Sequence, residues 1–245
     1  MQQTIAVSAV ALAIASGAAQ AAFFRFSPDT NDNSWAFTGN GANVTAATGS
    51  TPVILHIDDN NGPAPELQVS VSFVAQYTLT FVGSVNLPGG GQSLSYAANG
   101  SFSFTDIASG VTLLTTNFSN ALFTTRGGAN NGPWATTASL QVDDGLGAAV
   151  SMVWGGANLP AYGLMNGALN GSPRGFAFEM TSLNSSGALP YAGQNPGVSI
   201  NPTTRLPTAQ WWSEATYSST AAIPAPATLA AVGVGALAMG RRRRR

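Results

Sequence analysis

The sequence predicts an all-β fold, an antiparallel β-sandwich or jelly roll, with a closed barrel as the second choice. Apolar residues recur at every second position over one long stretch and several short ones. Turn-forming residues separate these stretches, in a chain that contains 28 glycines and 14 prolines. Outside the two ends, no stretch has the spacing of apolar residues that an amphipathic helix needs. We therefore expect residues 22–218 to form one β-sandwich-like domain, flanked by an N-terminal signal helix and a C-terminal apolar helix.

Residues 1–21 are expected to be a secretory signal peptide. Residues 5–15 form an apolar run, and Ala19-Gln20-Ala21 fits a small-x-small cleavage site, so the cut should fall near Ala21–Ala22. An amphipathic core helix is the alternative, but the run is apolar nearly all round.

The clearest strand lies at residues 67–82. Its odd positions, from Leu67 to Phe81, are all apolar, whereas its even positions are mostly polar. This alternation predicts one long or bent strand with one buried face and one wet face.

Shorter strands are expected on both sides of this long one. Asn99-Gly100 is a favoured hairpin turn, and Asp143-Asp144-Gly145 indicates a second hairpin. A further stretch is expected to be one or two strands, broken near residues 117–120. In the expected strand at 176–183, Phe176, Phe178 and Met180 share one side. The shorter expected strands lie at 52–57, 93–97, 101–105, 111–125, 134–142, 148–154, 176–183 and 210–218.

The C-terminal end has a separate organisation. A short linker, residues 219–226, ends in Pro224-Ala225-Pro226 and leads into the apolar segment 227–240. As a helix this segment would be roughly 20 Å long, shorter than a hydrocarbon core of about 30 Å. Five arginines, 241–245, follow it and should stay in the cytoplasm, which places the preceding chain across the membrane. The alternative, a buried helix with a basic nucleic-acid tail, would require a polar face that this segment lacks.

This layout resembles the PEP-CTERM sorting signal of Gram-negative bacteria that produce exopolysaccharide. In that family a Pro-Glu-Pro motif, a short transmembrane stretch and an arginine-rich end are processed by an exosortase, a membrane protease-transpeptidase. The matching motif is Pro224, Ala225 and Pro226, with alanine where the family usually has glutamate. The resemblance implies that the tail is a stop-transfer segment, inserted transiently in the inner membrane and ending in Arg241, Arg242, Arg243, Arg244 and Arg245. It further implies a product cut near Pro226 and delivered to the cell surface or extracellular matrix.

The composition excludes several classes of site and partner. The chain has no cysteine, which excludes disulfides, thiolate zinc sites and a cysteine nucleophile. Between the two ends, ten acidic residues face four arginines, a net charge of about −6 that argues against nucleic-acid binding. Charged residues make up only 8% of the chain, against about 25% in typical proteins. We therefore expect a surface of hydroxyl and amide groups.

His56 is the one histidine, so a two-histidine metal site is excluded. It could pair with a nearby carboxylate, or simply lie at a strand edge beside a turn. The sequence contains neither a Gly-x-Ser-x-Gly nucleophile elbow nor a glycine-rich phosphate motif before a helix.

Two groups of acidic and amide side chains are candidate calcium sites, and no other cofactor is expected. Asp29, Asn31 and Asn33 offer oxygen ligands at alternate positions, and Asp58 with Asp59 begins a second group. The alternative for both is ordinary turn chemistry, in which such side chains bond to nearby backbone.

The candidate residues for cleaving or binding a carbohydrate are glutamates and tryptophans. Glycoside hydrolysis needs two carboxylates about 5 to 9 Å apart, and the three glutamates are scattered through the sequence. Neighbouring residues in a strand point to opposite faces, so Glu179 should be solvated and one tryptophan of the Trp211–Trp212 pair should be buried. The glutamates are Glu66, Glu179 and Glu214, and the candidate tryptophans for stacking on sugars are Trp154, Trp211 and Trp212.

These observations favour an exported, non-enzymatic surface or biofilm-matrix protein of structural or interaction type. Its expected partners are signal peptidase and exosortase during processing, with exopolysaccharide as a candidate ligand. The alternatives are a carbohydrate-binding module of the exopolysaccharide, and a secreted glycan-active enzyme.

Overall fold

The computed structural model describes residues 21–26, 35–38, 41–48, 53–59, 64–128, 132–142, 147–169, 174–185 and 197–222. In this part of the chain it contains twelve strands and a short 3₁₀ helix, so the all-β class is confirmed. The signal segment before Ala21 and the tail after Ala222 lie outside the described residues. Among the helices of the described part, none is both long and apolar enough to cross a membrane.

The strands differ widely in length, and the central three are the longest. The strands are β1 (Ala21–Phe26), β2 (Trp35–Thr38), β3 (Asn43–Thr48), β4 (Val53–Asp58), β5 (Leu67–Asn86), β6 (Gln92–Asp106), β7 (Thr112–Gly127), β8 (Trp134–Gln141), β9 (Ala149–Trp154), β10 (Gly167–Leu169), β11 (Arg174–Asn184) and β12 (Trp211–Ala222). The 3₁₀ helix η3 (Pro160–Tyr162) lies between β9 and β10.

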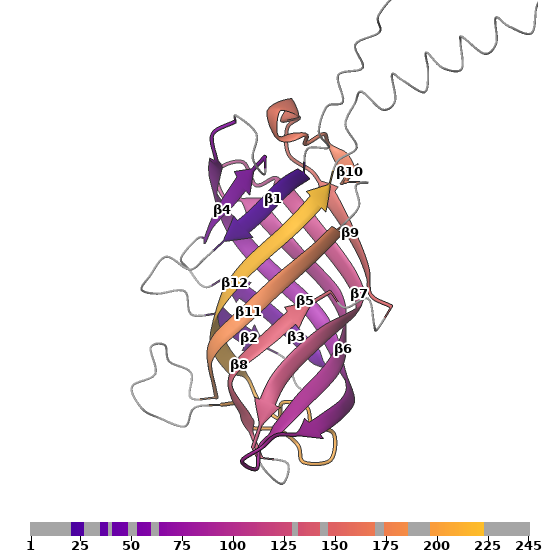
Figure 1. Ribbon diagram of the computed structural model, residues 1–245. Coiled ribbons are helices and arrows are strands. Elements are labelled where there is room, and N and C mark those ends of the chain that lie inside the picture. The colour runs from indigo at the N-terminus through magenta and orange to yellow at the C-terminus, as the bar shows by residue number, and fades with distance from the viewer. Residues whose placement is uncertain are drawn as a thin grey trace, which may run out of the picture.

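Eight of the shorter strands lie end to end, two by two, so that each such set of two occupies the place of one long strand in the sheet. Strands β1 and β2 both pair with β12, and β3 and β4 both pair with β5. Strands β8 and β9 follow one another along β7, while β10 and β11 lie on the other side of β9 and β8. The twelve strands therefore trace eight antiparallel lines in chain order, and the last line, β12, pairs with the first (Figure 1).

This ring-like bonding corrects the first choice made from the sequence. A β-sandwich or jelly roll consists of two sheets, whereas the pairings here join every strand into one sheet that returns to its start. The arrangement agrees with the closed barrel named second, in which the last strand satisfies the free edge of the first.

Strand β12 also runs beyond the expected end of the domain at residue 218. Ser219 and Ala221 face inward and are buried, and Ala222 pairs with Ala21. Residues 219–222, expected as linker, thus belong to the closing strand of the ring.

Side chains fill the interior of the ring. In β5 the odd positions from Val71 to Leu79 are buried and the even positions are half-buried or exposed, as the alternation predicted. Aromatic rings from opposite sides meet at the centre, where Phe102 contacts the rings of Phe73, Phe178 and Tyr217 at 5.3–5.7 Å. Each such buried side chain contributes about 1.5–3 kcal/mol through removal of apolar surface from water.

Two hairpins expected from turn signals are absent from the described pairings. Residues 92–106 form one strand, because Gly100 lies against β5, where a Cβ would come within 2.1 Å of the Gln76 carbonyl oxygen. Asn99 and Asn120 form an irregularity at this point, and Asn120 has a positive φ of 52°. The stretch 111–125 is likewise one strand, and the residues around Asp143 connect β8 to β9, which pair with β7 rather than with each other.

Candidate functional site

Buried side chains pack inside the ring at both of its ends. At the end where β12 finishes, Trp154 donates from Nε1 to the Ala157 carbonyl oxygen at 2.8 Å, and Leu164 is buried beside it. At the other end Trp134 is buried, and its Nε1 donates to the Tyr96 hydroxyl at 2.9 Å. A segment at residues 197–207 covers this end, and its Val198 pairs with Trp134.

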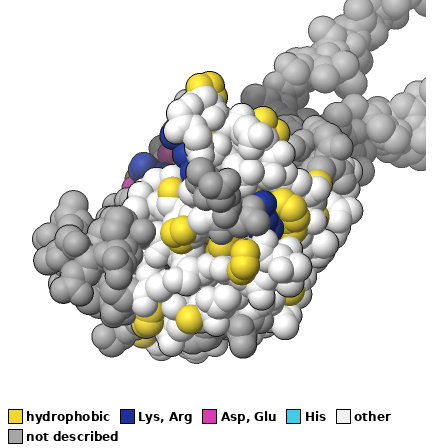
Figure 2. All heavy atoms as spheres, turned by 90° about the horizontal axis from the view of Figure 1, so that it is seen from below, with side chains coloured by type: hydrophobic (Ala, Val, Ile, Leu, Met, Phe, Trp, Pro, Cys, Tyr) yellow, Lys and Arg dark blue, Asp and Glu magenta, His cyan; other side chains and the backbone are white. Residues whose placement is uncertain are grey.

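The outer wall over β5, β6 and β7 consists mostly of hydroxyl and amide side chains, with a few apolar ones such as Val82 and Val85. Only Asp106 and Arg126, each near the end of its strand, are charged in these three strands. Cross-strand partners line up in rows, such as Gln76, Ser101 and Asn117. Seen from below, the described surface likewise carries few charged side chains (Figure 2). The uncharged surface that the composition predicted is therefore confirmed for this wall.

A groove of about 310 Å³ crosses the outer wall over β6, β7, β8 and β11. Most of its lining residues face outward and six of the ten carry a hydroxyl group, whereas Thr125, Ala138 and Met180 are buried. We call this set the outer groove: Ser93, Thr124, Thr125, Arg126, Thr137, Ala138, Ser139, Glu179, Met180 and Thr181.

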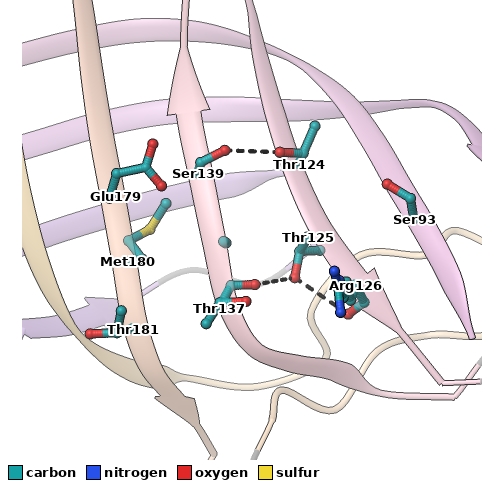
Figure 3. A pocket seen from close by; sticks show the side chains of 10 residues that line it. Ser93, Thr124, Thr125, Arg126, Thr137, Ser139, Glu179, Met180 and Thr181 are labelled. Carbon is teal, nitrogen blue, oxygen red and sulfur yellow. Dashed lines mark hydrogen bonds between the residues drawn. The ribbon is translucent and has the colours of Figure 1, made fainter.

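The register arranges the outer groove as two rows that cross the strands. In the first row Thr124 pairs with Ser139 and Ser139 with Glu179, and Ser95 continues the row on β6 outside the groove lining. In the second row Ser93 pairs with Arg126, and Thr181 lies further along on β11. Figure 3 shows Glu179 on one side of the groove and Ser93 and Arg126 on the other.

The groove forms where β8 separates from β7. Thr125 pairs with Ala138 and Gly127 with Trp134, so three residues of β8 face one residue of β7. The Thr125 hydroxyl donates to the Thr137 carbonyl oxygen at 2.8 Å across this irregularity. Such bulges open a strand pair locally and redirect side chains.

Arg126 and Glu179 carry opposite charges but do not meet. No ion pair joins Arg126 to a carboxylate, and no donor reaches the carboxylate of Glu179, within the described part of the chain. Partial burial raises the pKa of the Glu179 carboxyl group. The groove thus holds a carboxylate that is partly removed from water and lacks a compensating partner.

A second polar cluster lies on β1, on β4 and just before β5. The Arg25 guanidinium donates to Oε2 of Glu66, and Nδ1 of His56 lies 2.6 Å from Oε1 of the same carboxylate. Gln68 Nε2 donates to Glu66 Oε1 at 3.3 Å. The bonds from Arg25 and then His56 lower the pKa of Glu66 to about 2. Of the two possibilities that the sequence left open for His56, the structure shows the pairing with a carboxylate, and the His56 backbone lies between β1 and β5 rather than at a sheet edge.

The three glutamates occupy two separate places. Glu66 is held by Arg25 and His56, whereas Glu179 and Glu214 lie on the neighbouring strands β11 and β12. Glu214 Oε2 accepts bonds from the Ser182 hydroxyl at 3.2 Å and from the Thr181 hydroxyl at 3.4 Å. Glu179 is exposed opposite buried Phe178, as predicted.

The tryptophans proposed for sugar stacking need a correction. Trp154 and Trp211 are each only 1% exposed, since both point into the ring, so neither offers a face to a sugar. Trp212 is half-buried and points the opposite way from Trp211, as the strand alternation predicted. The outer groove contains no aromatic residue.

The candidate calcium ligands are only partly described. Asp29, Asn31 and Asn33 lie outside the described residues, as do the sorting motif and the five arginines. Asp59 is buried, and its Oδ2 accepts a bond from the Ala64 amide at 3.1 Å, which is turn chemistry next to Asp58 at the end of β4. The residues that the structure describes hold no group of three or more histidine, cysteine or acidic side chains placed to bind a metal ion.

No family of known proteins, no curated protein and no solved structure matches this chain.

The outer groove was not predicted, although part of its signal is present in the sequence. Thr124 and Ser139 each alternate with buried neighbours in their strands, which marks them as outward-facing. Their meeting depends on the register between β7 and β8, which the sequence alone does not supply.

Proposed function

We propose that this chain is an exported, non-enzymatic surface or matrix protein that is processed at both ends and interacts through its outer wall. The pairing of β1 with β12, which continues from Ala22 and Ala221 after the expected cut, carries this proposal. The two segments expected to direct export and sorting leave the ring next to each other, at one end. Their removal takes away no strand of the ring, since β1 and β12 lie between them.

The resemblance of the tail to an exosortase signal supplies the proposed route. After export the apolar segment 227–240 holds the precursor in the inner membrane, and the arginines prevent its passage. Pro224 follows the end of β12 by two positions. A protease can therefore reach the motif without opening the closed sheet, and the product goes to the cell surface or matrix.

The proposal of a non-enzymatic role is supported by the placement of the carboxylates. The Glu66 carboxylate is bonded to Arg25 and His56. Glu179 and Glu214 lie on an open wall, where no enclosed cleft within the described residues would keep water from a reacting bond.

The test of sorting is an intact-mass measurement on the full chain, produced in a Gram-negative host with and without an exosortase. We expect loss of residues 1–21 in both hosts, and loss of the tail after the Pro224–Pro226 region only with the exosortase. A Pro224→Ala, Pro226→Ala double variant should accumulate with its tail, whereas Ala225→Glu, which restores the usual family residue, should be cut at least as completely. Soluble protein inside the cell that retains its arginines would contradict the proposal.

The test of the non-enzymatic role is hydrolysis of the host's own exopolysaccharide by the purified protein. We expect no release of reducing ends. Cleavage that is abolished by Glu66→Gln, Glu179→Gln or Glu214→Gln would show that the chain is an enzyme.

A further inference from the structure

The outer groove offers several polar groups that the protein itself leaves unused. The hydroxyls of Thr124 and Ser139 bond to each other at 2.9 Å, and each retains further hydrogen-bonding capacity. The side chains of Ser93, Arg126 and Glu179 have no partner within the part of the chain that the structure describes. A ligand in the groove would therefore meet free donors and acceptors on both sides.

The shape and lining of the groove favour an extended polyhydroxylated ligand. Neighbouring strands lie about 4.8 Å apart, so the groove from β6 to β11 spans about 14 Å across the strands. Hydroxyl side chains both donate and accept, as sugar hydroxyls do, and the groove presents hydroxyls on each of β6, β7, β8 and β11. Because the groove lacks aromatic residues, recognition there would rest on hydrogen bonds and charge rather than on stacking.

The charges decide which sugar fits the end of the groove at β11. Glu179 is partly desolvated and has no cation beside it, so an ammonium group on the ligand would supply the missing partner. Glu214 lies on the next strand and adds negative potential. Arg126 lies at the opposite side, where it disfavours an amine and can donate to hydroxyl oxygens. The net charge of about −6 between the two ends adds a weaker long-range attraction for a cationic polymer.

We propose that the outer groove binds a linear polysaccharide of amino sugars, which lies across β6, β7, β8 and β11 with a free ammonium group against Glu179. This inference rests on the proposed function, because it names the partner of the outer wall.

The test is calorimetric titration of the full chain, purified in detergent, with soluble oligosaccharides of equal length. The probes are a glucosamine oligomer, its N-acetylated form, a cellulose oligomer and a galacturonic acid oligomer. We expect the glucosamine oligomer to bind with saturation and the other three to bind at least about tenfold more weakly, as loss of one charged hydrogen bond predicts.

Variants in the groove separate the roles of charge and hydroxyl groups. Glu179→Gln should weaken glucosamine binding by about tenfold, and Thr124→Val by about threefold to tenfold. Arg126→Gln should strengthen this binding, since it removes a repelling charge and keeps a side-chain donor for the ligand hydroxyls. Thr80→Val, a hydroxyl loss on the same wall outside the groove, is the matched control and should have no effect. Thermal unfolding of each variant checks that the ring is intact, and Glu179→Ala, which also removes the charge, replaces Glu179→Gln if the latter fails to fold.

Three results would overturn the inference. They are no saturable binding of the glucosamine oligomer, equal binding of its N-acetylated form, or unchanged binding in Glu179→Gln. Weaker binding in Arg126→Gln together with tighter binding in Glu179→Gln would assign an anionic ligand instead. A chain that is exported and cut but does not bind would overturn the groove alone, whereas a chain that binds but is never exported would overturn the proposed function alone.

Discussion

The side chains on the inner face of a strand differ in burial and polarity from those on the outer face of the same strand, and this difference is larger than the difference between any two strands. Along β5, Phe73 and Tyr77 point into a packed aromatic core, while their sequence neighbours Ser72 and Thr78 belong to an uncharged outer wall. The inner face holds the ring together by burial and by ring-on-ring contact. The outer face contributes little to folding, so it is free to serve recognition. Substitutions on the inner face should therefore change stability, and those on the outer face should change binding.

The largest expected effect comes from the centre of the inner face. Phe102 is fully buried among five aromatic rings, so Phe102→Ala should lower the free energy of unfolding by about 3–5 kcal/mol. Ser103→Ala changes the next residue on the outer face and should alter it by less than about 0.5 kcal/mol. Urea unfolding of both variants measures the difference. Equal losses of unfolding free energy in the two variants would contradict the division into a stabilising inner face and an outer face that contributes little.

A glycine pair tests the close contact between β5 and β6. At Gly100 a Cβ would lie 2.1 Å from the Gln76 carbonyl oxygen and 2.5 Å from the Tyr77 Cβ, so Gly100→Ala should cost about 3 kcal/mol. At Gly83 nothing lies within 4 Å of the added atom, and Gly83→Ala should stabilise by about 0.4–1 kcal/mol. Thermal unfolding should therefore shift in opposite directions. A tolerated Gly100→Ala would contradict the continuous strand at residues 92–106.

Two tyrosine hydroxyls, one on Tyr96 in the core and one on Tyr162 at the surface, allow a buried hydrogen bond to be compared with an exposed one. The Tyr96 hydroxyl accepts from Trp134 Nε1 and donates to the Arg205 carbonyl oxygen at 2.6 Å, so Tyr96→Phe should cost about 1–2 kcal/mol. Tyr162 donates to the Pro65 carbonyl oxygen at 2.6 Å on the surface, and Tyr162→Phe should cost less than about 1 kcal/mol. Chemical denaturation compares them, and a larger loss in Tyr162→Phe would reverse the expected order.

The smallest expected effect on stability comes from the surface cluster of Glu66 with Arg25, His56 and Gln68. The folded-state pKa of about 2 lies below the usual 4.5, so the ionised carboxylate stabilises the fold above pH 4.5 and loses this contribution as the pH falls toward 2. The groups that face it are Arg25, His56 and Gln68. Glu66→Gln should cost less than about 1 kcal/mol near neutral pH, because the cluster lies at the surface. The difference between variant and parent should vanish near pH 2, and a difference that is independent of pH would exclude the cluster as its source.

The inner face was largely predictable, and the closure of the ring was not. The alternation in residues 67–82 predicted β5 and its buried side, and the side shared by Phe176 and Phe178 followed from the same rule. Asn99-Gly100 was read as a turn because local signals cannot reveal that Gly100 faces the backbone of Gln76. The pairing of β1 with β12, and the rows of the outer groove, depend on contacts between residues far apart in the sequence. Local patterns carry no information on such contacts.

Closure of the ring between its first and last strands is the claim on which the rest depends, and one cross-link tests it directly. Phe23 and Thr220 are outward-facing register partners on β1 and β12, and the chain has no cysteine of its own. The Phe23→Cys, Thr220→Cys variant should form a disulfide on oxidation and migrate faster on a non-reducing gel, since paired residues lie within disulfide reach. In the control, Phe23→Cys with Thr216→Cys, the partner lies about 13 Å further along β12 and should not react. Rapid cross-linking of the first variant alone is the predicted result, and equal or absent cross-linking in both would contradict the closed ring.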